Sequence, residues 1–226
     1  MLSRRTRLLI LAAPVAASLA LAGPALAVGA TKGDKAILKA GVITKADVPA
    51  DWTSKKGEST GAALRGIKDC RKINAAVADA KKDIPRAQSR QFSDPVPEHA
   101  TMAQDAVYAF SNNRSATKFV STYQGARAQA CFEKLATEVA KDRPTAGPPT
   151  AAPITDLQGV GDEATGYEIA ATFTQDGGAA TLYIDLVLVR VGRAVMGFTF
   201  TNVDARIPQG PEIVYAVVQR VSAAEA

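Results

Sequence analysis

The sequence has few of the residues on which metal binding and much of enzyme catalysis depend. It contains one histidine and two cysteines among 226 residues. A zinc site of the H-E-x-x-H type, which needs two histidines, is therefore excluded. The acidic residues between positions 156 and 168 do not have the spacing of an EF-hand calcium loop. We accordingly expect no metal and no cofactor.

The lone histidine, His99, lies in the polar stretch SDPVPEHAT. We interpret it as a surface-loop residue. A hydrolase would need serine and aspartate partners brought to this histidine by folding. No local pattern singles out a pair of acids for glycoside hydrolysis either. We expect no enzymatic activity and no catalytic residue, and we keep an unrecognised hydrolase as a second alternative.

Positive charge is not concentrated anywhere in the sequence. The lysine pairs at 55–56 and 81–82 are isolated and are typical of solvated faces. Without the three arginines of residues 1–27, 24 Lys and Arg stand against 22 Asp and Glu, so the formal net charge falls from +5 to +2. Nucleic-acid binding needs clustered positive charge, so we exclude nucleic acid as a partner.

Long hydrophobic runs are also scarce, since there is only one, LLILAAPVAASLALAG at 8–23. It follows three arginines, is interrupted by Pro14, and precedes Ala25-Leu26-Ala27, a small-residue cleavage pattern. We predict a secretory signal peptide over residues 1–27, with Val28 as the first residue after cleavage and an uncleaved anchor as the alternative. The protein would then be secreted or associated with the cell envelope, with no stable membrane span.

The two cysteines, Cys70 and Cys131, are expected to form a disulfide, because exported proteins reach an oxidising environment in which disulfides form and persist. The bridge would close a loop of about 60 residues, which stabilises a fold by roughly 4 kcal/mol in the chain-entropy model. A redox or metal-binding pair is the alternative, but the wide spacing and the lack of C-x-x-C disfavour it.

Hydrophobic periodicity predicts an α+β fold, with an antiparallel sheet that includes a C-terminal three-stranded meander and packs against helices. The pattern indicates a helix over 70–82, a strand over 101–110 and a helical stretch from Ser115 with a break near Gly125. Alternating residues predict the strands of the meander between 165 and 201, and a helix follows from Gly210. We expect one domain over 28–226 with a Pro-rich loop at 143–153, although that loop could separate two domains.

One face of the predicted meander is only half apolar, and either cover or a cleft would account for it. The residues assigned to this face are Tyr183, Asp185, Val187, Val189, Val195, Thr199 and Thr201. If the face is a cleft, we expect Tyr183, Val187, Val195 and Thr199 to line it.

Residues 159–164, GVGDEA, fit the G-x-G-x-x-G/A pattern of a dinucleotide-binding loop. Such a loop needs a helix after it, whose N-terminus holds the phosphates. Here a strand pattern follows, and Asp162 and Glu163 would repel phosphate. We therefore interpret the stretch as a glycine-rich turn that precedes a strand.

Four stretches of the chain resemble the PknH-like extracellular sensor-domain family of secreted actinobacterial proteins. They are AILKAGVITKADVPADW, FVSTYQGARAQAC, LQGVGDEA and ATLYIDLVLVRVGRAVMGF. The resemblance implies an antiparallel sheet packed with helices, a central cleft for a ligand, and no enzymatic activity. Relatives can carry two disulfides and a kinase domain, whereas this sequence has cysteines for one disulfide and no kinase domain.

These observations predict an exported, non-enzymatic ligand-binding or sensor-like module of the cell envelope. Its expected partner is a small or apolar ligand held in a sheet-lined cleft. The alternative is an envelope protein with an interaction or structural role, whose partner is another envelope protein.

Overall fold

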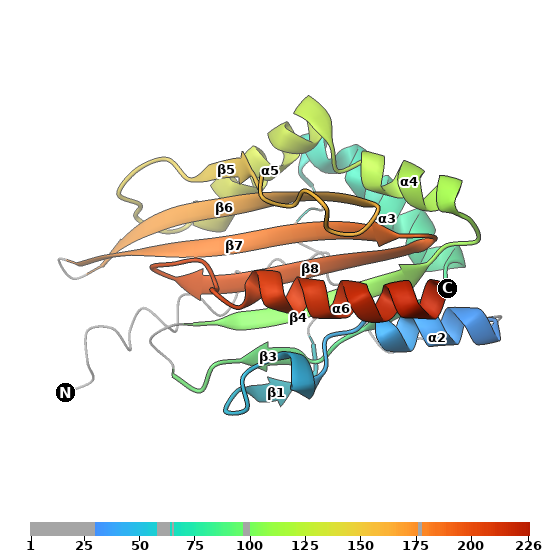
Figure 1. Ribbon diagram of the computed structural model, residues 1–226. Helices are drawn as coiled ribbons and strands as arrows, with labels where there is room; N and C mark the ends of the chain where they lie inside the picture. The colour runs from blue at the N-terminus through green and yellow to red at the C-terminus, as the bar shows by residue number, and fades with distance from the viewer. Residues whose placement is uncertain (1–29, 58–63, 65, 97–99, 176–177) are drawn as a thin grey trace.

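The structure is a computed structural model that describes residues 30–226 apart from 58–63, 65, 97–99 and 176–177. It confirms the predicted α+β fold with an antiparallel sheet, helices and one disulfide. Helices lie on both faces of a long, twisted sheet (Figure 1). The predicted signal peptide falls outside the described residues.

The eight strands form one sheet in the order β1-β3-β4-β8-β7-β6-β5, with β2 pairing to β4 as well. All of these pairs are antiparallel. The strands are β1 Thr53–Lys55, β2 Arg86–Gln88, β3 Gln91–Ser93, β4 Met102–Ala109, β5 Thr150–Pro153, β6 Glu163–Gln175, β7 Gly178–Val191 and β8 Ala194–Val203.

The predicted meander is formed by β6, β7 and β8, which are the longest strands. Val191 pairs with Ala194, so only Gly192 and Arg193 make the turn between β7 and β8. Gly192 has a φ of +54°, a conformation that favours glycine. The dipeptide Asp176-Gly177, whose sequence is typical of a type I′ hairpin turn, lies outside the described residues. The expected loop at 143–153 ends in β5, a short edge strand that pairs with β6.

The helices begin and end at recognisable signals. Thr31 and Asp34 form a capping box at the start of the first helix, which ends before Gly41. The helical stretch predicted around Gly125 is two helices, and Gly125 has a φ of +76° at the junction. The helices are α2 Lys32–Ala40, α3 Arg71–Asp83, α4 Asn113–Ser121, α5 Gly125–Ala140 and α6 Gly210–Glu225, and the short 3₁₀ helices are η1 Lys45–Asp47 and η2 Lys68–Cys70.

The sheet is covered on both faces and separates two hydrophobic cores. One core joins α3, α4 and α5 to side chains such as Ile169 and Leu186. The other joins α2 and α6 to side chains such as Met196 and Phe198. In Figure 1, α6 and α2 lie on the near face of the sheet. We call the two surfaces the α3–α5 face and the α2/α6 face.

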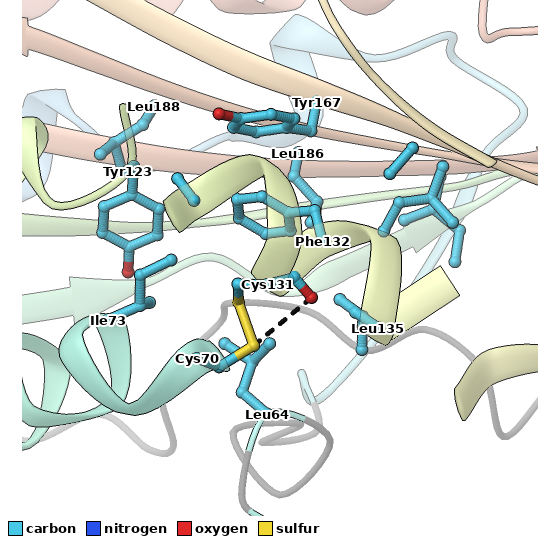
Figure 2. Close-up of a cluster of buried hydrophobic side chains, with 14 of the residues drawn as sticks. Leu64, Cys70, Ile73, Tyr123, Cys131, Phe132, Leu135, Tyr167, Leu186 and Leu188 are labelled. Carbon is cyan, nitrogen blue, oxygen red and sulfur yellow. Dashed lines mark hydrogen bonds between the residues drawn. A yellow bond between two sulfur atoms is a disulfide. The ribbon is translucent and has the colours of Figure 1, made fainter. Parts of the chain in front are cut away.

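The predicted disulfide is present and belongs to the core of the α3–α5 face. Cys70 and Cys131 are bonded, and neither residue is exposed to solvent. Figure 2 shows the bridge beside Phe132, Leu135 and Leu64. It joins the start of α3 to the middle of α5, so it fixes two helices on one face of the sheet. Within the described part of the chain, no helix is long and apolar enough to span a bilayer.

Candidate functional site

A cleft remains on the α2/α6 face, where α6 does not fill the space above the sheet. It has a volume of about 250 Å³ and lies between the start of α6, residues 156–160 of the connection between β5 and β6, and strands β7 and β8. Most of its wall is apolar. The apolar side chains are Leu157, Val160, Val187, Phe200 and Val214. Tyr215, on α6, also borders the cleft and is 54% exposed, so the cleft opens to solvent beside it.

A glycine in β6 allows the segment 154–162 to lie close against the sheet. A Cβ at Gly166 would come within 3.2 Å of the side chains of Leu157 and Ile154 and within 2.9 Å of a backbone oxygen in β7. The N–H of Ile154 donates to the Gly166 carbonyl at 2.9 Å. This close approach places Leu157 in the wall of the cleft.

Polar residues gather around Arg206 on one side of the cleft. Its Nε lies 2.8 Å from Asp185 Oδ2 and 3.3 Å from Glu168 Oε2. Its Nη1 lies 4.0 Å from Asp156 Oδ2. Glu168 and Asp185 are directly opposite each other on β6 and β7, where like charges repel. Arg206 offsets that repulsion.

Asp185 is the most buried polar residue of the cleft wall. Its side chain is 8% exposed, and only its Oδ2 is paired with Arg206. Its Oδ1 has no hydrogen-bond partner among the described residues. Burial raises the pKa of Asp185 above its ordinary value, and the hydrogen bond from Arg206 only partly opposes this. A buried acceptor without a partner is unusual in folded proteins and calls for an explanation.

The four residues predicted to line a cleft do not lie together, and this prediction is wrong. Tyr183 and Val187 are on the α2/α6 face, whereas Val195 and Thr199 are on the α3–α5 face. The two-residue turn explains the error, because it pairs odd-numbered residues of β7 with even-numbered residues of β8. Val187 therefore shares its face with Phe198. Of the four, Val187 lines the observed cleft.

The remaining residues of the cleft were missed by sequence reasoning. Asp156, Leu157 and Arg206 come from connecting segments, and Val214 comes from a helix. These residues do not belong to one sequence motif. They become neighbours only when separate segments fold against β7. Of the residues that line the cleft, only Asp185 and Val187 belong to the strand face that the sequence analysis assigned to it.

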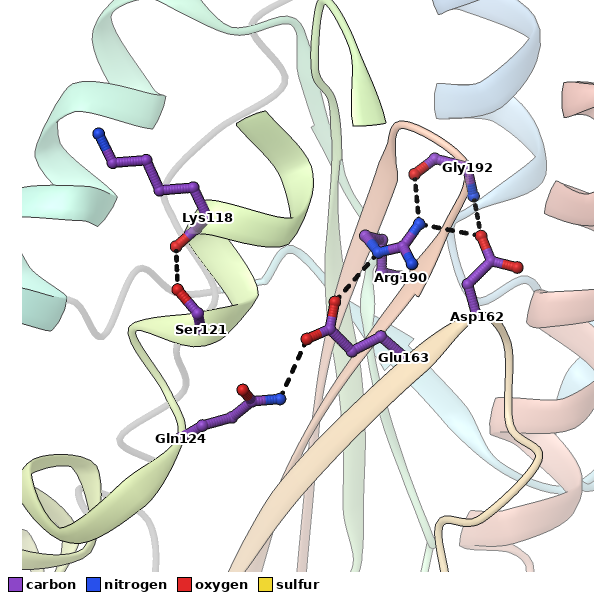
Figure 3. Close-up of polar contacts among 7 residues, drawn as sticks. All are labelled: Lys118, Ser121, Gln124, Asp162, Glu163, Arg190 and Gly192. Atoms are coloured by element: carbon purple, nitrogen blue, oxygen red, sulfur yellow. Dashed lines mark hydrogen bonds and ion pairs between the residues drawn. The ribbon is translucent and has the colours of Figure 1, made fainter. Parts of the chain in front are cut away.

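The GVGDEA stretch has no contact with this cleft beyond Val160, and its two acids bind an arginine. Asp162 Oδ2 lies 3.0 Å from Arg190 Nη1, and Glu163 Oε2 lies 3.1 Å from Arg190 Nε (Figure 3). The strand β6 begins at Glu163, as expected for a turn before a strand. The acids between 156 and 168 are thus divided between Arg190 and Arg206. Among the described residues no acidic, histidine or cysteine group could hold a metal ion.

A second buried acid, Asp105 on β4, lies in the core of the α2/α6 face and is 0% exposed. Its Oδ1 accepts the N–H of Ile43 at 2.9 Å, and its Oδ2 has no partner in the described structure. Burial raises the pKa of this carboxyl to about 7. Asp105 does not line the cleft beside α6.

Another hollow, between α5 and β5, is a weaker candidate for a binding site. It has a volume of about 340 Å³ and is bordered by Glu133, Lys134, Thr137 and Thr150. All four residues are exposed. A site for a small ligand is usually concave and mostly apolar, which favours the cleft beside α6.

Two features relevant to hydrolase chemistry lie wholly or partly outside the described residues. His99 is one of them. The other is GESTG at 57–61, which matches the G-x-S-x-G pattern of a nucleophile motif. This match was missed by sequence reasoning. A nucleophile elbow places its serine between a strand and a helix. The described chain before it is the three-residue strand β1, and residues 58–63 are not described.

Comparisons with known proteins identify no family. No family model matches the sequence. No curated protein matches it either. One similar solved structure is that of LpqN, described as involved in cell envelope biogenesis of Mycobacterium tuberculosis. It shares 12% sequence identity over 78% of each chain, with a TM-score of 0.28, which is too low to support an argument about fold or function. Membership of the PknH-like family stays a prediction.

Proposed function

We propose that this protein is an exported, non-enzymatic binding module of the cell envelope that holds the apolar part of a small ligand in the cleft beside α6. The observation that carries this proposal is the cleft of about 250 Å³ with an apolar wall. Its volume is slightly below the roughly 300–1,000 Å³ of sites for drug-sized ligands. It therefore suits a small molecule or one end of a longer chain.

The envelope location is supported by the predicted signal peptide and by the disulfide. Disulfides persist in oxidising compartments outside the cytosol and are rare inside it. The bridge joins two completely buried cysteines. The proposed sensor-like role rests on the sequence resemblance to PknH-like domains.

Binding of a neutral apolar fluorophore, N-phenyl-1-naphthylamine, tests the proposal. We expect its fluorescence to rise in the presence of the protein. Val160→Phe places a larger side chain into the cleft from a half-buried segment, and it should weaken binding by about tenfold or more through loss of apolar contact area. Val96→Phe is the matched control, because Val96 is 41% exposed and lies outside the cleft. The absence of binding to the wild-type protein, or equal binding by both folded variants, would reject the proposal.

A role in protein interaction is the alternative, and the exposed Tyr215 at the border of the cleft favours it. Tyrosine is enriched where proteins contact each other. Native mass spectrometry of protein from the producing organism distinguishes the two functions. A bound small molecule supports the first proposal, and a protein partner that is lost in Tyr215→Ala supports the second.

A further inference from the structure

From the unpaired oxygen of Asp185, we infer that the ligand of the cleft carries a cationic group, an alkylammonium, which Asp185 binds while the alkyl chain lies against the apolar wall. This inference rests on the proposed function and adds the chemical class of the ligand. It starts from a polar residue whose side chain is 8% exposed, belongs to the cleft wall and keeps Oδ1 without a partner among the described residues.

The missing partner must be a hydrogen-bond donor. An ionised aspartate is an acceptor only, with two oxygens that can both be paired. Arg206 Nε donates to Oδ2 and leaves Oδ1 unpaired. The terminal torsion of aspartate is broad and roughly two-fold, so the carboxylate can turn either oxygen toward a donor without leaving its rotamer. An ammonium group offers three N–H donors to this carboxylate.

The charge around Asp185 distinguishes an ammonium from a neutral donor such as a hydroxyl. Asp156, Glu168 and Asp185 share one guanidinium, that of Arg206. These four residues therefore carry a formal net charge of −2 when all are ionised. A cation entering here brings the local charge closer to zero, whereas a carboxylate or a phosphate is repelled.

The apolar wall explains why the cation should carry an alkyl chain. Val187 is next but one to Asp185 on β7, so the two side chains project from the same face of the strand. Phe200 is the direct cross-strand partner of Asp185. Both apolar side chains line the cleft together with the carboxylate. An amphipathic cation contacts all three groups at once.

Displacement of the bound fluorophore by three ligands of equal chain length tests this inference. They are octylammonium, octanol and octanoate at neutral pH. A charge-assisted hydrogen bond is about twice as strong as a neutral one. We therefore expect octylammonium to compete about tenfold better than octanol, and octanoate to compete worst.

Substitutions identify the group responsible for that preference. In Asp185→Asn the preference for octylammonium over octanol should fall to about threefold or less, with octanol affinity unchanged, because a neutral amide cannot pair with a cation. The side chain of Asp156 is 66% exposed, so this position should tolerate substitution better than the buried Asp185. Asp156→Asn should reduce the preference for octylammonium by a smaller factor than Asp185→Asn does. Asp162→Asn is the matched control, since Asp162 pairs with Arg190 away from the cleft and should leave the preference unchanged.

The outcomes separate this inference from the proposed function. If the fluorophore binds but wild-type protein prefers octanol or shows no preference, the cationic ligand is rejected and the apolar cleft stands. An unchanged preference in folded Asp185→Asn and Asp156→Asn also rejects it. If neither the fluorophore nor any of the three ligands binds, the proposed function itself fails.

Discussion

Arg190 and Asp162 are joined by an ion pair that fixes the turn between β7 and β8. The distance from Arg190 Nη1 to Asp162 Oδ2 is 3.0 Å, and the same oxygen accepts the N–H of Gly192 at 2.7 Å. Arg190 Nη1 also donates to the Gly192 carbonyl. Asp162 therefore pairs with both the side chain of one strand and the backbone of the turn that follows it. The second acid, Glu163, completes the contact with Arg190 (Figure 3).

The two glycines of GVGDEA should respond differently to substitution by alanine. Both have positive φ angles, +80° at Gly159 and +66° at Gly161. A Cβ at Gly161 would lie 2.6 Å from the Arg190 carbonyl oxygen, whereas nothing lies within 4 Å of a Cβ at Gly159. We expect Gly159→Ala to lower the free energy of unfolding by about 1–2 kcal/mol from backbone strain alone. Gly161→Ala should lower it by about 3 kcal/mol or more, because a clash with backbone adds to the strain.

Urea denaturation of the two variants measures this difference, and each serves as the control for the other. Equal losses of stability would show that the close contact at Gly161 does not exist in solution.

Opening the disulfide should destabilise the protein substantially. The replacement of both Cys70 and Cys131 by alanine removes a bond that closes a loop with a sequence separation of 61 residues. We expect the free energy of unfolding to fall by about 2–5 kcal/mol, as in other exported domains. Urea denaturation with and without a reductant checks the result. Reduction breaks the bond but leaves both cysteine side chains, whereas the alanine variant also removes the sulfur atoms. The reduced wild-type protein therefore measures the effect of the bond without the effect of smaller side chains.

The reductant should lower the unfolding midpoint of the wild-type protein and leave that of the double variant unchanged. A wild-type midpoint that is insensitive to reductant, after thiol labelling has confirmed reduction, contradicts the predicted contribution of the bridge.

Much of the fold could be predicted because long segments carry strong periodic patterns. The alternation in β6 predicts that Tyr167 and Phe173 lie on one face, and both belong to the core of the α3–α5 face. The shortest strands were not predicted, since β1, β2 and β3 have three residues each and are too short to show a period. They form by pairing with β4 or with each other, which is a tertiary effect.

The cleft was harder to predict, because it depends on which residues face each other across a turn. Shifting the pairing of two strands by one residue moves a whole set of side chains to the other face. Gly192 indicates a turn, but the sequence does not show how many residues the turn has. Because the turn has two residues, Val195 and Val187 lie on opposite faces of the sheet. The contact of Arg206 with Asp185 likewise depends on a connecting segment that folds back over β7.

The buried carboxyl of Asp105 should make the stability of the protein fall as the pH rises. Burial is the largest cause that raises its pKa from 3.8 to about 7, and Asp47 adds to this, while the Ile43 N–H, Ser89 and Arg220 oppose it. Between these two pKa values the folded protein holds a proton that the unfolded chain has released. The stabilising contribution is therefore complete below about pH 4 and is lost as the pH rises through about 7.

Asp105→Asn removes this dependence, because an amide does not titrate and is close in shape to the carboxyl. We expect the variant to gain about 2–3 kcal/mol of unfolding free energy relative to the wild-type protein between about pH 5 and pH 8. Asp34→Asn is the control: burial raises the pKa of Asp34, but hydrogen bonds from Arg193 and Thr31 outweigh it and lower the pKa below 3.8. Its side chain is thus ionised in both states over that pH range, and the stability difference of this variant should stay nearly constant. Urea denaturation at the two pH values measures both differences, and a constant difference for Asp105→Asn would show that the carboxyl of Asp105 is already ionised at pH 5 in the folded protein.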